Sequence, residues 1–176
     1  MTATESAPAI VPSFDDEEDS GRKLAIICSK GNLDMAYPGL ILGNAALGEG
    51  VETHLFFTFW GFDMIVKSRM NNLQFSPAGN AAMHLPFKDI HLPQALAPAM
   101  TGAATKMLKK QIADLGVPEV PAFLDQIVGA GGHLWACRLS AEMMHLDASA
   151  LRDDVEGIIN ASDFIEKTAG AQLLFI

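Results

Sequence analysis

Short apolar runs alternate with amphipathic segments from Arg22 to the C-terminal end of the chain. Runs rich in Ile, Leu, Val and Phe, bounded by Gly, Asn and Ser, are typical of buried β-strands. They predict strands at or within residues 23–28, 51–59, 133–137, 153–159 and 171–176. Because these runs alternate with helical segments, we predict an α/β fold whose mostly parallel sheet is covered by helices on both faces.

Apolar positions spaced by three or four residues predict the helices between these strands. The expected helices span residues 33–50, 61–70, 94–116, 118–132, 138–146 and 162–170. Residues 71–93, by contrast, contain Pro, Gly and Asn in an irregular stretch. A stretch of this length predicts a functional loop or a contact between subunits.

Acidic residues are concentrated at the start of the chain. Residues 1–20 contain six acidic residues and no Lys or Arg, which leaves 15 acidic and 12 basic residues, a net charge of -3, in residues 21–176. We therefore expect residues 1–20 to form a disordered acidic tail, with a solvating role or a docking role for a basic partner. Residues 21–176 have the length and apolar content of a single domain.

The composition argues against several partners. Nucleic-acid binding needs a dense basic surface, and the chain has only one basic cluster, Lys106, Lys109 and Lys110 on one predicted helix face. That cluster is either a solvated face or a docking patch for an acidic partner or a small anion. No uncharged apolar run reaches the length of a membrane span, and no signal peptide is evident, so we expect a cytoplasmic protein.

Familiar cofactor and metal signals are missing from the sequence. The glycines of residues 129–132 precede a predicted strand, whereas a dinucleotide-binding loop follows a strand and opens a helix. No phosphate-loop lysine is found, so we expect no nucleotide cofactor. His54, His84 and His91 lack the spacing of a ligand cluster, so we expect no metal site.

The chain has two cysteines, and each ends a predicted strand. In parallel sheets, reactive groups gather beyond the carboxyl ends of the strands. Cys137 also precedes a predicted helix, whose first amides, with the neighbouring Arg138, favour a thiolate. A buried, space-filling Cys137 remains an equal alternative. Cys28 is either a core residue or a resolving thiol, and the latter requires its Cα to lie within about 7 Å of that of Cys137.

Several segments resemble a known family. They are SKGNLDMAYPGLILGNAALGEGVETHLFFTFWGFDMIVK (29–67), SPAGNAAM (76–83), MLKKQI (107–112) and ACRLSAEMM (136–144). Together they resemble the DsrE/DsrF/DsrH-like sulfur-transfer family, most closely the DsrE-like branch often labelled peroxiredoxin-family proteins. The resemblance extends from Lys23 to Ile176 and leaves out the acidic tail.

The resemblance implies a three-layer α/β/α domain with a five-stranded parallel sheet, assembled into homo-oligomers. It also implies a cysteine that carries sulfur as a persulfide or bound thiosulfate, received from a rhodanese-like or TusA-like carrier. The family's Ala-Cys-x-x-Ser segment places that cysteine at Cys137, whereas the position of Cys28 is not generally a cysteine. Some members have a methionine where this chain has Ala141, which leaves the shape of the pocket open.

Our main hypothesis is a sulfur carrier or sulfurtransferase-like protein that acts through Cys137 and exchanges sulfur with a small sulfur anion or a carrier protein. Arg138 and the hydroxyl of Ser140 would stabilise the bound anion, and Met143 would line a soft pocket for sulfur unless it packs in the core. Two other hypotheses remain open. One is a non-catalytic oligomeric scaffold, and the other is a redox sensor that forms a Cys28–Cys137 disulfide.

Overall fold

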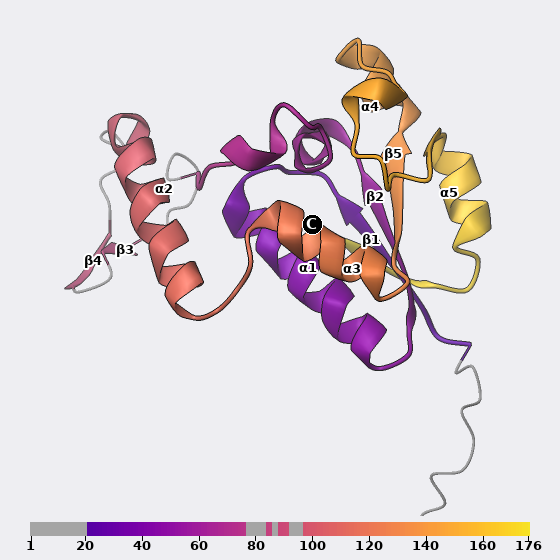
Figure 1. Cartoon of the computed structure of the whole chain (residues 1–176), viewed down its shortest axis with the longest axis horizontal. Coiled ribbons are helices and arrows are strands. Elements are labelled where there is room, and N and C mark those ends of the chain that lie inside the picture. Colours follow the sequence, from indigo (N-terminus) through magenta and orange to yellow (C-terminus); the bar gives the residue numbers. More distant parts are fainter. Residues whose placement is uncertain (1–20, 77–83, 86–87, 92–96) are drawn as a thin grey trace, which may run out of the picture.

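A parallel five-stranded sheet forms the centre of the molecule in the computed structural model, which describes residues 21–76, 84–85, 88–91 and 97–176 (Figure 1). Its strands are β1 (Lys23–Cys28), β2 (Glu52–Phe57), β5 (His133–Cys137), β6 (Gly157–Ile159) and β7 (Gln172–Phe175). Their order is β6-β5-β2-β1-β7, and every neighbouring pair is parallel. The predicted α/β class is confirmed, and β1 and β5 have the predicted bounds.

Helices cover the sheet on both faces and complete a three-layer α/β/α arrangement (Figure 1). They are α1 (Leu33–Gly48), α2 (Ala97–Asp114), α3 (Val120–Gly129), α4 (Arg138–Met143) and α5 (Ala161–Lys167). α1 and α3 pack together on one face, and α5 covers the other. α4 follows β5 directly at the carboxyl edge of the sheet, whereas α2 lies away from the sheet.

The predicted helix over residues 61–70 is wrong. This part of the chain forms two short 3-10 helices, η1 (Phe59–Met64) and η2 (Met70–Asn72), with an antiparallel bridge between Val66 and Leu151. The reason is the burial of consecutive residues, since the side chains from Met64 to Val66 are all inside the core. An α-helix would turn some of these neighbours towards solvent.

Part of the irregular stretch over residues 71–93 forms a small antiparallel pair, β3 (His84–Leu85) with β4 (Lys88–His91). Residues 77–83, 86–87 and 92–96 and the expected tail over residues 1–20 lie outside the described residues. The role of this stretch in function or oligomerisation therefore stays a prediction. Within the described part of the chain, no helix is both long enough and apolar enough to cross a membrane.

The two faces of the sheet contribute to two separate cores. Because side chains alternate along a strand, Leu55 and Phe57 of β2 join the larger core under α1 and α3, while Phe56 joins the smaller core under α5. In the smaller core the ring of Phe56 stacks on that of Phe164, with ring centroids 4.6 Å apart. The cysteines are divided in the same way: Cys28 belongs to the larger core and Cys137 to the smaller one.

The carboxyl end of β1 anchors the turn that follows β2. The carbonyl of Cys28 accepts a hydrogen bond from the amide of Thr58 at 3.0 Å, and the amide of Gly61 donates to the Thr58 carbonyl at 3.0 Å. Gly61 lies directly against the Cys28 carbonyl, where a Cβ atom would overlap the oxygen. The η1 turn therefore crosses the end of β1 in direct backbone contact.

We expect Gly61→Ala to destabilise the protein by about 1–3 kcal/mol, because the added methyl group overlaps backbone that cannot move away freely. Gly48→Ala at the end of α1 is the control, since nothing lies within 4 Å of a Cβ added there. Urea unfolding followed by circular dichroism measures both variants. Equal midpoints for the two would contradict the close contact between η1 and β1.

Candidate functional site

Cys137 is the last residue of β5 and the N-cap residue of α4, so its thiol lies at the carboxyl edge of the sheet. The residue is largely buried, with 8% of its surface exposed. The hydroxyls of Thr58 and Ser140 and the amides of Leu139 and Ser140 all act on the pKa of this thiol. Two elements that are far apart in sequence, the end of β2 and the start of α4, therefore contribute to the surroundings of Cys137.

Opposing effects set the pKa of Cys137. Burial is the largest single effect and raises the pKa, because removing an anion from water is unfavourable. The hydrogen bonds from Thr58, Ser140 and Leu139 stabilise the thiolate, and together they lower the pKa below its ordinary value of 9.0. This shift increases the fraction of nucleophilic thiolate near neutral pH. The role of Cys137 as the reactive residue stays a prediction.

Thr58 and Ser140 form a hydroxyl pair beside the sulfur. Their oxygens lie 3.2 Å apart, and the Ser140 oxygen also accepts a hydrogen bond from the amide of Phe59 at 2.7 Å. Both side chains are buried. Sequence reasoning proposed Ser140 but missed Thr58, although Thr58 directly follows β2 and the carboxyl ends of parallel strands meet at one edge.

Arg138 and Met143 are not placed against the sulfur by any described contact. Arg138 is exposed, and its guanidinium donates to the side-chain oxygen of Asn160 and to the carbonyl of Ile158, each at 3.0 Å. These bonds direct it towards the junction of β6 and α5. Met143 ends α4 with 46% of its surface exposed. Both residues are exposed on α4.

Cys28 is in a different environment. It is 3% exposed, and burial raises the pKa of its thiol to about 12. β1 and β5 flank β2 on opposite sides, so their Cα atoms are about two strand spacings, roughly 9–10 Å, apart. A disulfide needs Cα atoms within about 7 Å. The structure thus does not bring the two thiols together, and it places them on opposite faces of the sheet.

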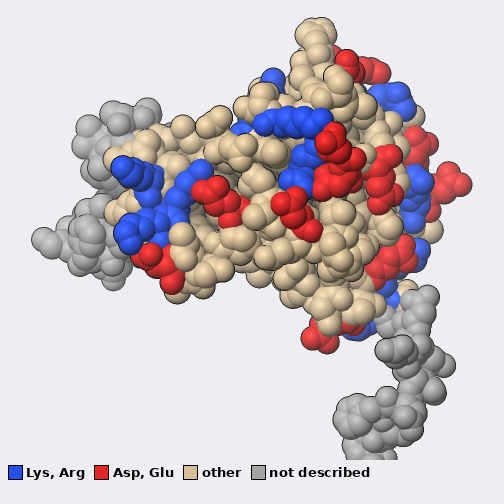
Figure 2. Space-filling view, viewed as in Figure 1, with Lys and Arg blue, Asp and Glu red and all other residues tan. Residues whose placement is uncertain are grey.

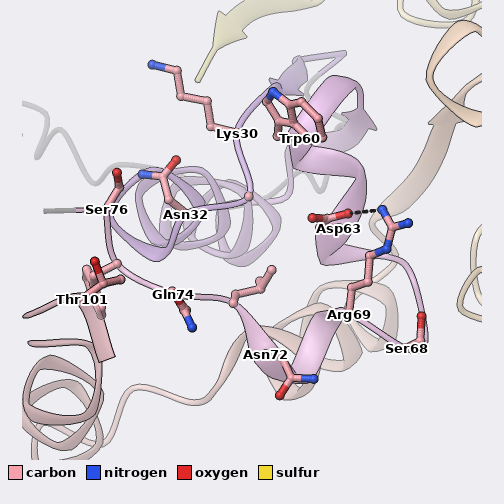
Figure 3. A pocket seen from close by; sticks show the side chains of 13 residues that line it. Lys30, Asn32, Trp60, Asp63, Ser68, Arg69, Asn72, Gln74, Ser76 and Thr101 are labelled. Carbon is pink, nitrogen blue, oxygen red and sulfur yellow. Dashed lines mark hydrogen bonds and ion pairs between the residues drawn. The ribbon is translucent and has the colours of Figure 1, made fainter. Parts of the chain in front are cut away.

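An open pocket of about 790 Å³ lies on the other side of the η1 turn (Figure 3). It begins at Lys30 and Asn32, which follow β1, and includes Trp60 and the ion pair between Asp63 and Arg69, whose atoms are 2.8 Å apart. Most of its other labelled side chains are polar (Figure 3). The pocket shares the η1 turn with the Cys137 site, but Cys137 does not line it.

Three potential metal ligands also lie together, at the opposite end of the strands: Glu52, His54 and His133 have ligand atoms within 4.8 Å of one another. Trp135 donates to Nδ1 of His54 at 3.2 Å, so Nε2 carries the proton and donates to Glu52 at 2.8 Å. Nδ1 of His133 lies 2.5 Å from Glu156, and the two imidazoles stack at 16°. The two rings are thus nearly parallel, and each of the three side chains already takes part in a hydrogen bond.

Basic side chains gather at the end of the molecule where α2 lies, and charges of both signs are mixed over the rest of this face (Figure 2). α2 carries the predicted cluster of Lys106, Lys109 and Lys110, and Lys110 is paired with Asp114 at 2.9 Å.

We predict that Ser140→Ala and Thr58→Val each raise the pKa of Cys137 by roughly one unit, because each removes a hydrogen-bond donor to the thiolate. The measurement is the rate of iodoacetamide alkylation of Cys137 as a function of pH, followed by mass spectrometry. Leu139→Ala serves as the control, since it keeps the backbone amide that donates to the sulfur. An unchanged titration in both hydroxyl variants would contradict the described contacts.

The His54 cluster predicts a pH dependence of stability. Burial lowers the pKa of His54 despite its bond to Glu52, so the unfolded chain takes up a proton at higher pH than the folded one. The free energy of unfolding should then decrease as pH falls below about 6.5. His54→Phe should reduce this slope and, at pH 8, cost about 1–3 kcal/mol because Trp135 loses its acceptor. Urea titrations between pH 5 and pH 8 measure both effects, and a wild-type slope in the variant would contradict the assignment.

Comparisons with known proteins identify the family of this chain. A model of the DsrE/DsrF/DrsH-like family matches residues 20–176. The chain is 33% identical over 138 residues to the sulfur carrier protein DsrE2 of Allochromatium vinosum, covering 77% of this chain and 86% of that protein. It is 23% identical over 165 residues to the uncharacterized protein YrkE of Bacillus subtilis, covering 88% and 97%.

A solved structure shares the fold. The crystal structure of the ychN protein from E. coli has a TM-score of 0.51 and 11% identity, covering 88% of this chain and 99% of that one. At this identity the likeness concerns the fold alone. The family match, which includes every described strand and helix, is the stronger finding. This chain therefore belongs to the DsrE/DsrF/DrsH-like family.

Proposed function

We propose that this protein is a sulfur carrier that holds sulfane sulfur on Cys137, as a persulfide or bound thiosulfate, and relays it to a partner. The observation that carries the proposal is the buried pair of Thr58 and Ser140 hydroxyls, 3.2 Å apart, at the carboxyl edge of the sheet where Cys137 ends β5, together with the lowered pKa of that thiol. The similarity to a protein named as a sulfur carrier supports it. An uncharged set of donors suits a site where an anion must form and later be released.

The proposed chemistry is an exchange between thiols. The thiolate of Cys137 attacks the outer sulfur of a donor persulfide, a sulfur–sulfur bond forms to Cys137, and the bond inside the donor breaks. The donor leaves as a thiolate and takes up a proton from water. In the second half, the thiolate of an acceptor attacks the outer sulfur, and Cys137 returns to its starting state. No metal, oxidant or reductant is consumed in this cycle.

The partners and setting follow from this chemistry. We expect the donor or acceptor to be a rhodanese-like protein, another sulfur-carrier protein or a small sulfur anion. Arg138 and Met143, exposed on α4, are proposed to meet that molecule as it approaches. We further propose a homo-oligomer in the cytoplasm, where the reducing environment keeps the thiol free.

The alternatives differ in what they require of the cysteines. A redox sensor needs a Cys28–Cys137 disulfide, and within one chain the strand spacing and the opposite faces oppose it. A scaffold needs no reactive thiol at all. The hydrogen bonds to Cys137 favour the carrier over the scaffold, since a space-filling cysteine has no need of donors that stabilise its anion.

Exposure of the native protein to glutathione persulfide should add one sulfur atom to Cys137 and none to Cys28. Mass spectrometry of the whole chain and of its peptides measures this, and a second thiol should then remove the added sulfur. Cys28→Ser should load like wild type, and Cys137→Ser should not load. Loading of neither thiol, or of Cys28 alone, would sink the proposal.

A further inference from the structure

Phe59 has a backbone conformation that its own side chain does not explain. Its φ is 45°, in the left-handed region, and within the described ranges the only other non-glycine residue with a positive φ is His145. Bulky residues rarely adopt this conformation because it is strained. Phe59 is about half exposed, at 49% of its residue surface, so burial of its side chain does not offset this strain. Some other contact must hold the residue in place.

The backbone contacts on both sides of Phe59 supply the constraint. Thr58 still has extended backbone and remains bonded to the end of β1, whereas Gly61 already lies against the Cys28 carbonyl. The chain must therefore turn sharply between these two residues. In this turn the amide of Phe59 is directed at the Ser140 oxygen, 2.7 Å away.

The amide of Phe59 restricts the Ser140 hydroxyl. A hydroxyl has one proton and two acceptor positions, and the Phe59 amide occupies one of the acceptor positions. The proton must then point elsewhere: the Thr58 oxygen lies 3.2 Å away, and the Ser140 hydroxyl also helps to lower the pKa of Cys137. A donated hydrogen bond also polarises the hydroxyl and strengthens the bond that it makes in turn.

We propose that the Thr58–Phe59 turn is a positioning element for the sulfur site: the strained backbone of Phe59 fixes the Ser140 hydroxyl, which with Thr58 holds the Cys137 anion. The purpose of this turn rests on the proposed function, whereas the geometry of the turn is independent of that function. Phe59 is thus a positioning residue that acts through its backbone. The charged side chains of the surrounding elements do not take over the role of the Phe59 backbone, because they have other partners. Arg138 is bonded to Asn160 and Ile158, and Asp163 accepts from the Asn160 amide.

The test is a series of substitutions at Phe59 that share the loss of the ring and differ in how well they tolerate a positive φ. Glycine adopts this conformation freely, alanine less so, and β-branched valine least. We expect the pKa of Cys137 to stay within about 0.2 unit of wild type in Phe59→Gly, and to rise by roughly 0.5–1 unit in Phe59→Val, with Phe59→Ala between them. Trp60→Ala is the control, because it removes the neighbouring exposed ring and leaves the turn intact.

The readout is the pH dependence of Cys137 alkylation, measured peptide by peptide so that the buried Cys28 does not contribute. Equal shifts in the Gly, Ala and Val variants would show that the ring is responsible and would overturn the proposal, as would a wild-type titration in Phe59→Val. If Phe59→Val does not fold, the order of the Gly and Ala variants decides the same question. Persulfide loading of Phe59→Gly separates this inference from the proposed function: failure to load despite a wild-type pKa would contradict the carrier role only.

Discussion

The site depends on a balance at one buried sulfur atom, between the cost of removing a thiolate from water and the hydrogen bonds that stabilise it. Burial alone would leave Cys137 like Cys28, an inert thiol with a raised pKa. The difference lies in the donors that each sulfur meets. The larger core surrounds Cys28 with apolar side chains, whereas the edge of the sheet gives Cys137 two hydroxyls and two amides.

The parallel register of the strands makes this difference possible. β2 lies between β1 and β5, so the residue that follows β2 meets the backbone of Cys28 on one side and the start of α4 on the other. Thr58 is that residue: its amide bonds to the Cys28 carbonyl, and its hydroxyl lies 3.2 Å from that of Ser140 and lowers the pKa of Cys137. The contribution of Cys28 to the site thus comes through its carbonyl, which a substitution of its side chain leaves in place.

Hydrophobic patterning was sufficient to predict the strands, because burial on both faces of a parallel sheet requires apolar runs such as residues 23–28 and 133–137. It was insufficient for residues 61–70, where the buried run from Met64 to Val66 follows tertiary packing rather than a helical period. The position of Cys137 between β5 and α4 was predictable, because a strand-to-helix junction is a local signal. The place of Thr58 at the same site was not predictable, because it depends on which strands are neighbours in the sheet, and one sequence does not fix the order of the strands.

The nature of the donors bears on both halves of the proposed relay. When Cys137 accepts sulfur, the negative charge moves outwards by one sulfur–sulfur bond, about 2 Å, and the inner sulfur becomes neutral. When the acceptor attacks the outer sulfur, charge returns to the inner sulfur as the bond breaks, and the groups of Thr58, Ser140 and Leu139 that lower the pKa of Cys137 stabilise that charge. Donors that are fixed before the charge develops stabilise the transition state without reorganising. A permanent cation at this position would attract the negative charge in every state, including the persulfide anion, and would slow the release of the sulfur to the acceptor. Neutral dipoles held by a strained turn instead favour the leaving thiolate at the moment when the sulfur is handed on.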